Sequence, residues 1–490
     1  MMRAALAAAL LALPAADNPV DRHLGALWRE HGVSPAPRTG DAEFLRRASL
    51  DLTGTVPSEE DAARPPADRA RLVDALLASD AFAAHWADRL GHSLLGYPRD
   101  LEDHRINRPQ LHGWLRARLA ADAGWDAIVR GLLTATGDFG ADAPVSFINQ
   151  FTAFIKDAPV LRPEDVTAKA CEEFLGIRLR CAQCHDHPFD RWTQADFLAM
   201  TAFWRRTGFG AARTLERADK PFAYEVERAP LPGPRFLDGA AGRDDPADLA
   251  DRVVAHPQFA RVFVNRVWAC LFGRGLVEPW NDFSPSRRPV APALLDELAA
   301  AWRRENFRVR WLMRTVVLSE AYGLSSRAAD AKALPLFAAA RVRPLAPEQL
   351  YGAIARATRL AGAPIDVDRL RRLAGAQAHL PHDPHDALRA WFLRMSVQTS
   401  SPESPHAPSR LTANSLHAVH MMIVDSPLYD GARARLKELA GRPPAEAAAE
   451  LYLATLSRRP TAAELKRIAG EPLEDVFWCL LNCDEFVFNH

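Results

Sequence analysis

The sequence predicts a mainly α-helical protein with little strand, built as two helical domains joined by a linker rich in proline and glycine. Apolar residues recur at helical spacing in both halves of the chain. Between the halves, clustered glycines and prolines at 207–250 interrupt that spacing. The 490 residues leave room for two domains, and 48% hydrophobic with 25% charged residues is typical of a globular protein.

The charge balance argues against a nucleic-acid partner. Lysine plus arginine and aspartate plus glutamate both total 61, so the formal net charge is zero. Proteins that bind phosphate backbones usually carry a basic excess or a basic patch. Short basic pairs such as Arg205-Arg206 are typical of solvated helix faces. We therefore expect no nucleic-acid partner.

The first residues have the pattern of an export signal. Arg3 supplies a positive charge, Ala4–Ala16 form an apolar run, and Asp17 ends it. This run is too short to span a membrane, and no later segment has 18 uncharged apolar residues. We expect 1–16 to be a signal peptide, the mature chain to have no transmembrane segment, and the protein to lie in the periplasm or cell envelope. An ordinary helix start rich in alanine and leucine is the alternative.

Helical patterns follow one another through the first half. Apolar stripes lie at 72–77 and 82–90, and Ser79 between them is placed to cap the second helix. A further helix is expected at 163–176, because a proline begins it and a glycine ends it. Thr193 is placed to cap the helix after that.

Helical spacing resumes after the linker. We assign residues 17–206 to the first domain, 207–250 to the linker and 251–490 to the second domain. In the second domain we expect Arg266 or Arg274 to pair with Asp282 as a buried structural bridge. The apolar stripes of its helices lie at 259–270, 294–302, 312–317, 451–456 and 476–481.

The most specific chemical signal is the sequence CAQCH at 181–185, which has the CxxCH pattern of covalent c-type haem attachment. Two thiols add to the haem vinyl groups, and the adjacent histidine becomes an axial ligand of the iron. With 6 cysteines and 16 histidines, chance would produce this pattern in roughly two chains per thousand. We predict Cys181 and Cys184 as thioether anchors of haem c and His185 as the proximal iron ligand.

The sixth iron ligand is less defined by sequence. Met200 lies on the helix that follows the motif and would raise the reduction potential if it bound iron. A distant histidine could also reach the iron. The candidates are His85, His92, His104 and His112.

Two alternatives to haem stay open at the same segment. A zinc-type site would use Cys181, Cys184 and His187, with Asp190 as a fourth ligand, because adjacent Cys184 and His185 cannot easily bind one tetrahedral ion. A disulfide between the two cysteines, with hydrogen-bonded histidines, is the other alternative.

Several longer runs resemble a known pair of domains. RRASLDLTGTVP at 46–57 and FLGI at 174–177, which leads into 181–190 and 192–194, resemble the planctomycete cytochrome-like domain, domain of unknown function 1549. The second half resembles its usual companion, domain of unknown function 1553. The resembling runs are VNRVW at 264–268, LFGRGLV at 271–277, NDF at 281–283, LSEAY at 318–322 and LNCDEFVFNH at 481–490. The resemblance implies an exported bacterial protein and no known reaction.

Motif, export pattern and resemblance together favour an exported haem-binding electron carrier or redox subunit over a stand-alone enzyme. We expect its partner to be a redox protein of the cell envelope. Two other functions stay open. One is a metal-dependent hydrolytic or degradative enzyme centred on residues 184–187, and the other is a non-catalytic component of an extracytoplasmic assembly.

Overall fold

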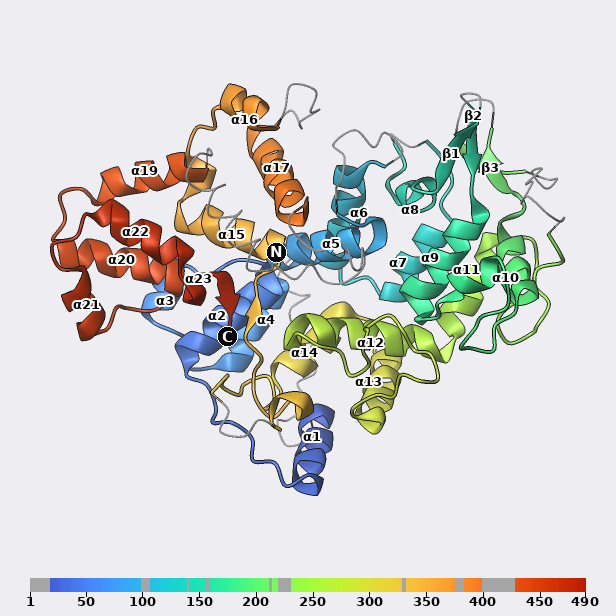
Figure 1. Cartoon of the computed structure of the whole chain (residues 1–490), viewed down its shortest axis with the longest axis horizontal. Helices are drawn as coiled ribbons and strands as arrows, with labels where there is room; N and C mark the ends of the chain where they lie inside the picture. The colour runs from blue at the N-terminus through green and yellow to red at the C-terminus, as the bar shows by residue number, and fades with distance from the viewer. Residues whose placement is uncertain are drawn as a thin grey trace, which may run out of the picture. The chain divides into compact units, whose positions relative to one another are not determined.

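The structure is a computed structural model of the whole chain (Figure 1). The predicted signal peptide at 1–16 and His104 lie outside the residues that it describes. The described residues are 18–97, 106–138, 141–155, 158–210, 214–218, 231–327, 332–374, 383–398 and 428–490.

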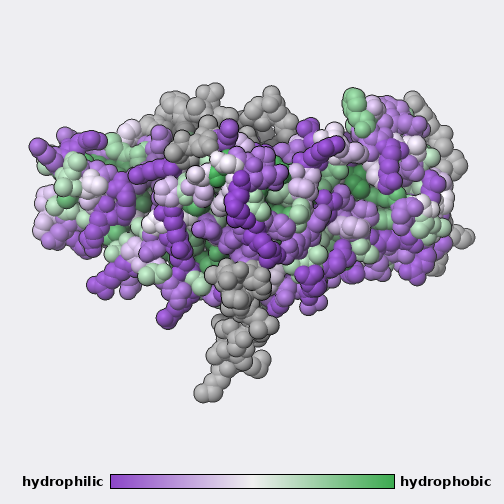
Figure 2. Space-filling view, turned by 90° about the horizontal axis from the view of Figure 1, so that it is seen from below, coloured by the Kyte–Doolittle hydropathy of each residue, from purple (hydrophilic) through white to green (hydrophobic). Residues whose placement is uncertain are grey.

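The predicted fold class is confirmed, because helices dominate the described residues and strands form only two-stranded sheets (Figure 1). The sheets pair β1 with β2, β3 with β4 and β5 with β6, all antiparallel. Hydrophilic side chains cover most of the face in Figure 2, with apolar residues scattered among them. Within the described residues, no helix is long and apolar enough to cross a bilayer.

The chain forms two compact units, and each unit combines segments from both halves of the sequence. Among the described residues, the first unit contains 18–27, 89–95 and 106–316, and the second contains 28–88, 96–97 and 317–490. The units therefore do not follow the order of the predicted segments 17–206 and 251–490. Three helices run across unit boundaries along the chain: α1 (Pro19–Glu30), α5 (Asp80–Leu95) and α14 (Val309–Val317).

In the first unit, α12 packs against α9 and α13, and α7 packs against α11. The helices are α6 (Arg108–Ala120), α7 (Trp125–Leu133), η3 (Ala143–Val145), α8 (Ser146–Asn149), α9 (Pro163–Leu175), η4 (Leu179–Gln183), α10 (Gln194–Thr201), η5 (Ala202–Trp204), α11 (Pro246–Ala255), α12 (Pro257–Phe272) and α13 (Pro292–Arg304). The strands are β1 (Thr152–Ile155), β2 (Ala158–Leu161), β3 (Thr207–Phe209) and β4 (Leu215–Arg217), the last two within the predicted linker.

In the second unit, α15 packs against α17 and α20, and α2 packs against α4. The helices are α2 (Asp41–Thr53), α3 (Glu59–Ala63), α4 (Arg69–Ala78), η6 (Leu334–Leu336), α15 (Pro347–Ala357), η7 (Leu360–Gly362), α16 (Val367–Ala374), α17 (Pro384–Gln398), α19 (Leu428–Leu439), α20 (Pro444–Leu456), α21 (Ala462–Ile468), α22 (Leu473–Asn482) and α23 (Asp484–Val487). The strands are β5 (Arg343–Pro344) and β6 (Phe488–Asn489).

Three helix ends predicted from sequence are confirmed. Ser79 caps α5 by accepting a hydrogen bond from the backbone N–H of Phe82 at 3.1 Å. Gly176 ends α9 with a φ of 63°, a left-handed conformation that glycine adopts without strain. Thr193 forms a capping box with Asp196 at the start of α10.

Helix α2 carries two buried arginines that bind the C-terminal region of the chain. Arg46 donates hydrogen bonds to the carbonyls of Thr455, Glu485 and Phe486 at 2.7, 2.9 and 3.0 Å, and to the hydroxyl of Ser457 at 3.3 Å. Burial lowers the pKa of Arg46 to about 10, so its guanidinium stays charged at neutral pH. The first-half segment 46–57 thus contacts the second half directly.

Arg47 extends the same connection. Its guanidinium donates to the carbonyls of Tyr322 and Leu324 at 2.5 and 2.8 Å and to that of His490 at 3.0 Å. Its ion pair with Glu43 spans 2.9 Å along the helix. Arg47 therefore joins α2 to the segment after α14 and to the last residue of the chain.

Asp51 is the buried acid at the centre of this arrangement. Its carboxylate accepts two hydrogen bonds of 2.6 Å from Arg343, one of 2.7 Å from the Tyr322 hydroxyl and one of 2.9 Å from the Asn489 amide. The Asp51 side chain is only 1% exposed. Burial, followed by the nearby Asp51 charge, raises the pKa of Tyr322, so this residue remains a neutral donor.

A second buried charge cluster joins the two halves within the first unit. Glu173 on α9 binds Arg266 on α12 at 2.6 Å, Lys169 at 2.9 Å and the Ser93 hydroxyl at 2.7 Å. Burial alone would raise the pKa of Glu173, but Arg266 and Lys169 lower it below its usual value. The predicted pairing of Arg266 with Asp282 is wrong, because α12 presents Arg266 to α9 instead.

The described partners of Asp282 lie on the surrounding loops. Arg178 and Arg287 approach its carboxylate at 3.7 and 3.6 Å. Both arginines are about half exposed, so water weakens these ion pairs. Asp282 therefore belongs to a partly solvated charge cluster and not to the predicted buried bridge.

The interleaved units predict that neither half of the chain folds alone. Segments 17–230 and 231–490, produced separately, should lack a cooperative unfolding transition, because each leaves buried charges and apolar surfaces without partners. Co-expressed, the two segments should associate and recover the transition in circular dichroism. A cooperative transition in either isolated segment would contradict this prediction.

Replacing Asp51 should destabilise the protein strongly. Asp51→Asn removes the buried carboxylate that pairs with the partly buried Arg343 guanidinium, so the free energy of unfolding in denaturant should fall by about 3–5 kcal/mol. The control is Asp368→Asn, which breaks an exposed ion pair with Arg371 and should cost no more than about 1 kcal/mol. Similar losses for the two variants would argue against a special role for Asp51.

Glu173 should make stability depend on acid. Its pKa is lower in the folded protein, so its stabilising effect is complete above the unfolded-state value, about 4.3, and is lost as pH falls through the folded-state value. The difference in unfolding free energy between wild type and Glu173→Gln should therefore shrink as pH is lowered from 7 toward 3. Denaturant titrations at each pH measure it, and a constant difference would contradict the prediction.

Candidate functional site

The CxxCH motif lies on the 3₁₀ helix η4 and the turn after it, between α9 and α10. Gly176 allows the sharp change of direction before η4. A Cβ atom at this position would lie 2.7 Å from the Phe283 ring and 2.9 Å from Val262, so no larger residue fits without a shift. Close packing at position 176 therefore requires a glycine three residues before η4 begins.

The motif turns its reactive side chains toward solvent. Leu179 and Ala182 of η4 are fully buried and anchor the turn. Cys181, Cys184 and His185 are exposed, and both cysteines are free thiols. A single turn thus presents two thiols and an imidazole to the outside.

Hydrogen bonds close the loop after the motif against the start of α10. The backbone N–H of His187 donates to the carbonyl of Trp192 at 2.8 Å. The Asp186 carboxylate accepts from the backbone N–H of Gln194 at 2.9 Å, and the Gln194 side chain donates to the carbonyl of Gln183 at 3.1 Å. The exposed side chains therefore stand on a fixed backbone.

His185 is held in one tautomer. Its Nδ1 lies 2.7 Å from the carbonyl oxygen of Asp186. A carbonyl oxygen can only accept, so Nδ1 carries the proton and donates. In the neutral ring, Nε2 then keeps its lone pair, which is the state required of a metal ligand.

The zinc-type residues are not brought together. Nδ1 of His187 accepts from the backbone N–H of Phe189 at 3.2 Å, and the carboxylate of Asp190 accepts from that of Arg191 at 2.7 Å. Across the described ranges, no group of three or more histidine, cysteine, aspartate or glutamate side chains is placed to hold a metal ion. The set of Cys181, Cys184, His187 and Asp190 is therefore not assembled in this conformation.

The described candidates for the sixth ligand are buried or partly buried side chains, unlike the exposed motif residues. Met200 is 1% exposed on α10, so its thioether belongs to the core. His92 and His112 contact each other edge to face at 5.3 Å in the first unit. His85 is buried in the second unit.

No sequence pattern predicted a role for the two residues that end the motif loop. Trp192 is 7% exposed, and its indole Nε1 has no hydrogen-bond partner. The guanidinium carbon of Arg191 lies 4.3 Å from the centre of the Trp192 ring. Only the structure could reveal this pair, because neither burial nor stacking can be predicted from the sequence at these two positions.

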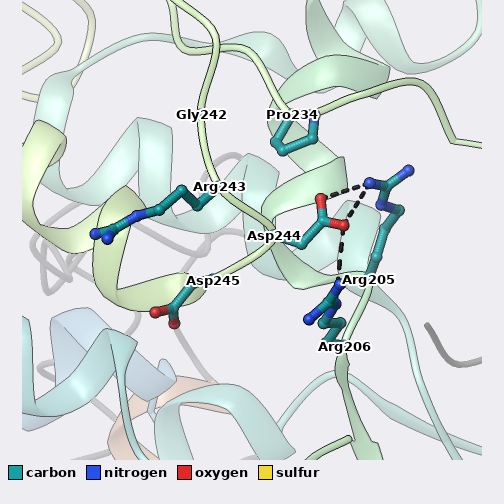
Figure 3. Close-up of a pocket in the computed structure, with 7 residues that line it drawn as sticks. All are labelled: Arg205, Arg206, Pro234, Gly242, Arg243, Asp244 and Asp245. Carbon is teal, nitrogen blue, oxygen red and sulfur yellow. Dashed lines mark hydrogen bonds and ion pairs between the residues drawn. The ribbon is translucent and has the colours of Figure 1, made fainter. Parts of the chain in front are cut away.

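A separate polar pocket of about 540 Å³ lies in the first unit (Figure 3). Arg205 binds the Asp244 carboxylate at 2.5 and 2.6 Å, and Arg206 approaches it at 3.8 Å. Arg243 extends away from this group (Figure 3). Arg205 is thus held in an ion pair. The sequence had instead predicted that Arg205 and Arg206 lie on a solvated helix face. The motif residues do not line this pocket.

The comparisons with known proteins support the resemblance. A family described as a protein of unknown function, DUF1549, matches residues 19–208, and another, DUF1553, matches residues 247–470. Neither the curated proteins nor the solved structures contain a match to the chain. The two matched segments correspond to the predicted halves and cover most of the sequence. The chain therefore contains a DUF1549 domain followed by a DUF1553 domain.

Proposed function

We propose that this protein binds haem c covalently and transfers electrons in the periplasm or cell envelope. Cys181 and Cys184 would be the thioether anchors, and His185 the proximal ligand. The observation that carries the proposal is the fixed imidazole of His185, with Nδ1 bonded to the Asp186 carbonyl, beside two exposed thiols on the same turn. When bound, the haem supplies one-electron redox chemistry.

The two thiols suit covalent attachment because both are exposed and on one turn. Each thiol would add across one vinyl group, so that sulfur bonds to one carbon and the hydrogen goes to the neighbouring carbon. This addition consumes no oxidant or reductant. Leu179 and Ala182, buried beneath the turn, hold the backbone while the thiols face outward.

His185 would bind iron through Nε2. The hydrogen bond from Nδ1 to the Asp186 carbonyl orients the ring and increases the basicity of Nε2. The Asp186 side chain strengthens this arrangement, because it binds the first backbone N–H of α10 and so fixes the position of its own carbonyl. Residue 186 is thus a positioning residue for His185.

Other segments that resemble the family contain residues whose buried contacts give them a structural role. Arg46, Asp51 and Arg266 are buried and joined by hydrogen bonds to distant parts of the chain. The motif loop differs, since most of its polar side chains are exposed. Phe189, at 89% exposure, is the most exposed large hydrophobic side chain of the described residues. This contrast supports a role for the loop in binding rather than in folding.

Export is part of the proposal. Attachment of haem c takes place outside the bacterial cytoplasm, so a chain with this motif needs to be exported. The exposed loop would also be the place where a redox partner protein of the cell envelope approaches. Electron transfer to such a partner requires only that the haem edge be accessible from the surface.

Haem staining tests the proposal. The full chain, produced in a bacterium with c-type maturation proteins, should be red and should keep its haem stain on a denaturing gel, because thioethers survive unfolding. The double variant Cys181→Ser, Cys184→Ser should lose the stain completely. The matched control Cys479→Ser, which removes an exposed cysteine elsewhere, should retain it.

Two results would each contradict the proposal. In the first, the wild-type chain is colourless and unstained while a reference cytochrome matured in the same cells carries haem. Retention of the stain in the double cysteine variant would likewise show that the motif is not the attachment site.

A further inference from the structure

The polar pocket of the first unit has the size and the lining of a binding site for a small charged molecule. Its volume is about 540 Å³, and the motif residues do not line it (Figure 3). Cavities of this size hold small organic ligands. Three arginines and two aspartates dominate the lining, so a ligand that fits here is itself charged or rich in hydroxyl groups.

Hydrogen bonds and close packing fix the backbone around the pocket. The backbone N–H of Gly242 donates to the carbonyl of Pro234 at 2.8 Å, which joins two loop segments of the wall. A Cβ atom at Gly242 would lie 2.4 Å from the Phe203 ring, so a larger residue does not fit without a shift. After β4, the backbone N–H of Ala218 donates to the carbonyl of Arg206 at 2.9 Å. The wall is therefore formed by contacts within the first unit.

Both carboxylates of the pocket already have a close arginine partner. Arg205 donates two hydrogen bonds to Asp244, at 2.5 and 2.6 Å. Asp245 pairs with Arg217 at 3.1 Å and caps α11 by accepting from the backbone N–H of Ala247 at 2.9 Å. Neither aspartate is therefore available to neutralise the remaining two arginines of the pocket.

Arg206 lines the pocket without a hydrogen bond to a carboxylate. Its Nε atom lies 3.8 Å from the nearer oxygen of Asp244, which is beyond hydrogen-bond distance (Figure 3). Its side chain is 43% exposed, and within the described residues its two terminal nitrogens have no acceptor. These nitrogens are therefore free to donate a parallel pair of hydrogen bonds to an oxyanion.

The surrounding charges favour an anion. Arg243 is 75% exposed and extends away from Arg205, so it attracts an anion through space without holding it (Figure 3). Its carboxylate partner Asp248 lies 3.7 Å away and is bound more closely by Arg252, at 3.0 Å. The pocket residues and their ion-pair partners together comprise five arginines and three aspartates, so positive charge is in surplus.

We propose that this pocket binds a small solute through a phosphate or sulfate ester group held by Arg206. The inference goes beyond the proposed function and does not depend on haem. A guanidinium binds either group through two parallel N–H···O bonds. One guanidinium satisfies both oxygens of a carboxylate, whereas a tetrahedral group keeps further oxygens for the second uncompensated charge. The cavity also leaves room for the organic part of the ester, whose hydroxyl groups would donate to Asp244 and Asp245.

Isothermal titration calorimetry of the full chain at about 150 mM salt, which screens diffuse attraction, tests the site. The probes are inorganic phosphate, inorganic sulfate, glucose 6-phosphate, glucose 6-sulfate, glucuronate and glucose. Wild type should bind a phosphate or a sulfate probe saturably and more tightly than glucuronate or glucose. The tighter of the two classes identifies the ester.

Replacing Arg206 should weaken this binding. Arg206→Gln should raise the dissociation constant about tenfold or more, the size expected for losing charge-assisted hydrogen bonds. Arg206→Lys should fall between Arg206→Gln and wild type, because an ammonium group keeps the charge and loses the planar pair of donors. Circular dichroism of each variant shows whether the fold is retained.

The control is Arg371→Gln, which removes a 66% exposed arginine of the second unit and should bind as wild type does. Three results would each overturn the inference: no saturable binding of any phosphate or sulfate probe to wild type, equal affinities for wild type and Arg206→Gln, or tighter binding of glucuronate than of all four tetrahedral probes. Each leaves the haem proposal standing, because haem staining tests that separately.

Discussion

The buried carboxylate of Asp51 is the interaction on which the second unit depends. A buried acid is destabilising unless hydrogen bonds and an opposite charge compensate it. Here Arg343, Tyr322 and Asn489 supply that compensation, and each comes from a part of the chain more than 250 residues away from Asp51. Helix α2 can therefore be buried only when the C-terminal region is folded around it.

The first unit applies the same principle at Glu173. Arg266 lies 93 residues further along the chain, yet it donates to both the carboxylate and the carbonyl of Glu173. In each unit, a charge from the DUF1549 segment is paired with one from the DUF1553 segment. This pairing gives a physical reason why the two domains occur on one chain. Without the other domain, each domain would have charged side chains that lack their partners.

The motif loop combines a fixed backbone with exposed side chains. Asp186 and Gln194 lock the loop to the start of α10, while Cys181, Cys184 and His185 stay accessible. Rigid placement lowers the conformational cost of binding a large planar group. The hydrogen bond at Nδ1 of His185 adds a defined tautomer, which a flexible surface histidine would lack.

Local sequence determined the helical class, the caps at Ser79 and Thr193, the end of α9 at Gly176 and the position of the CxxCH motif, because these depend on residues a few positions apart. The family resemblance was also readable from short runs. The interleaving of the two units was not, because it depends on contacts between residues hundreds of positions apart. The partner of Arg266, the burial of Met200, the dispersal of the zinc-type set and the Arg191–Trp192 stack were likewise decided only by tertiary structure, since burial and pairing arise when distant segments pack together.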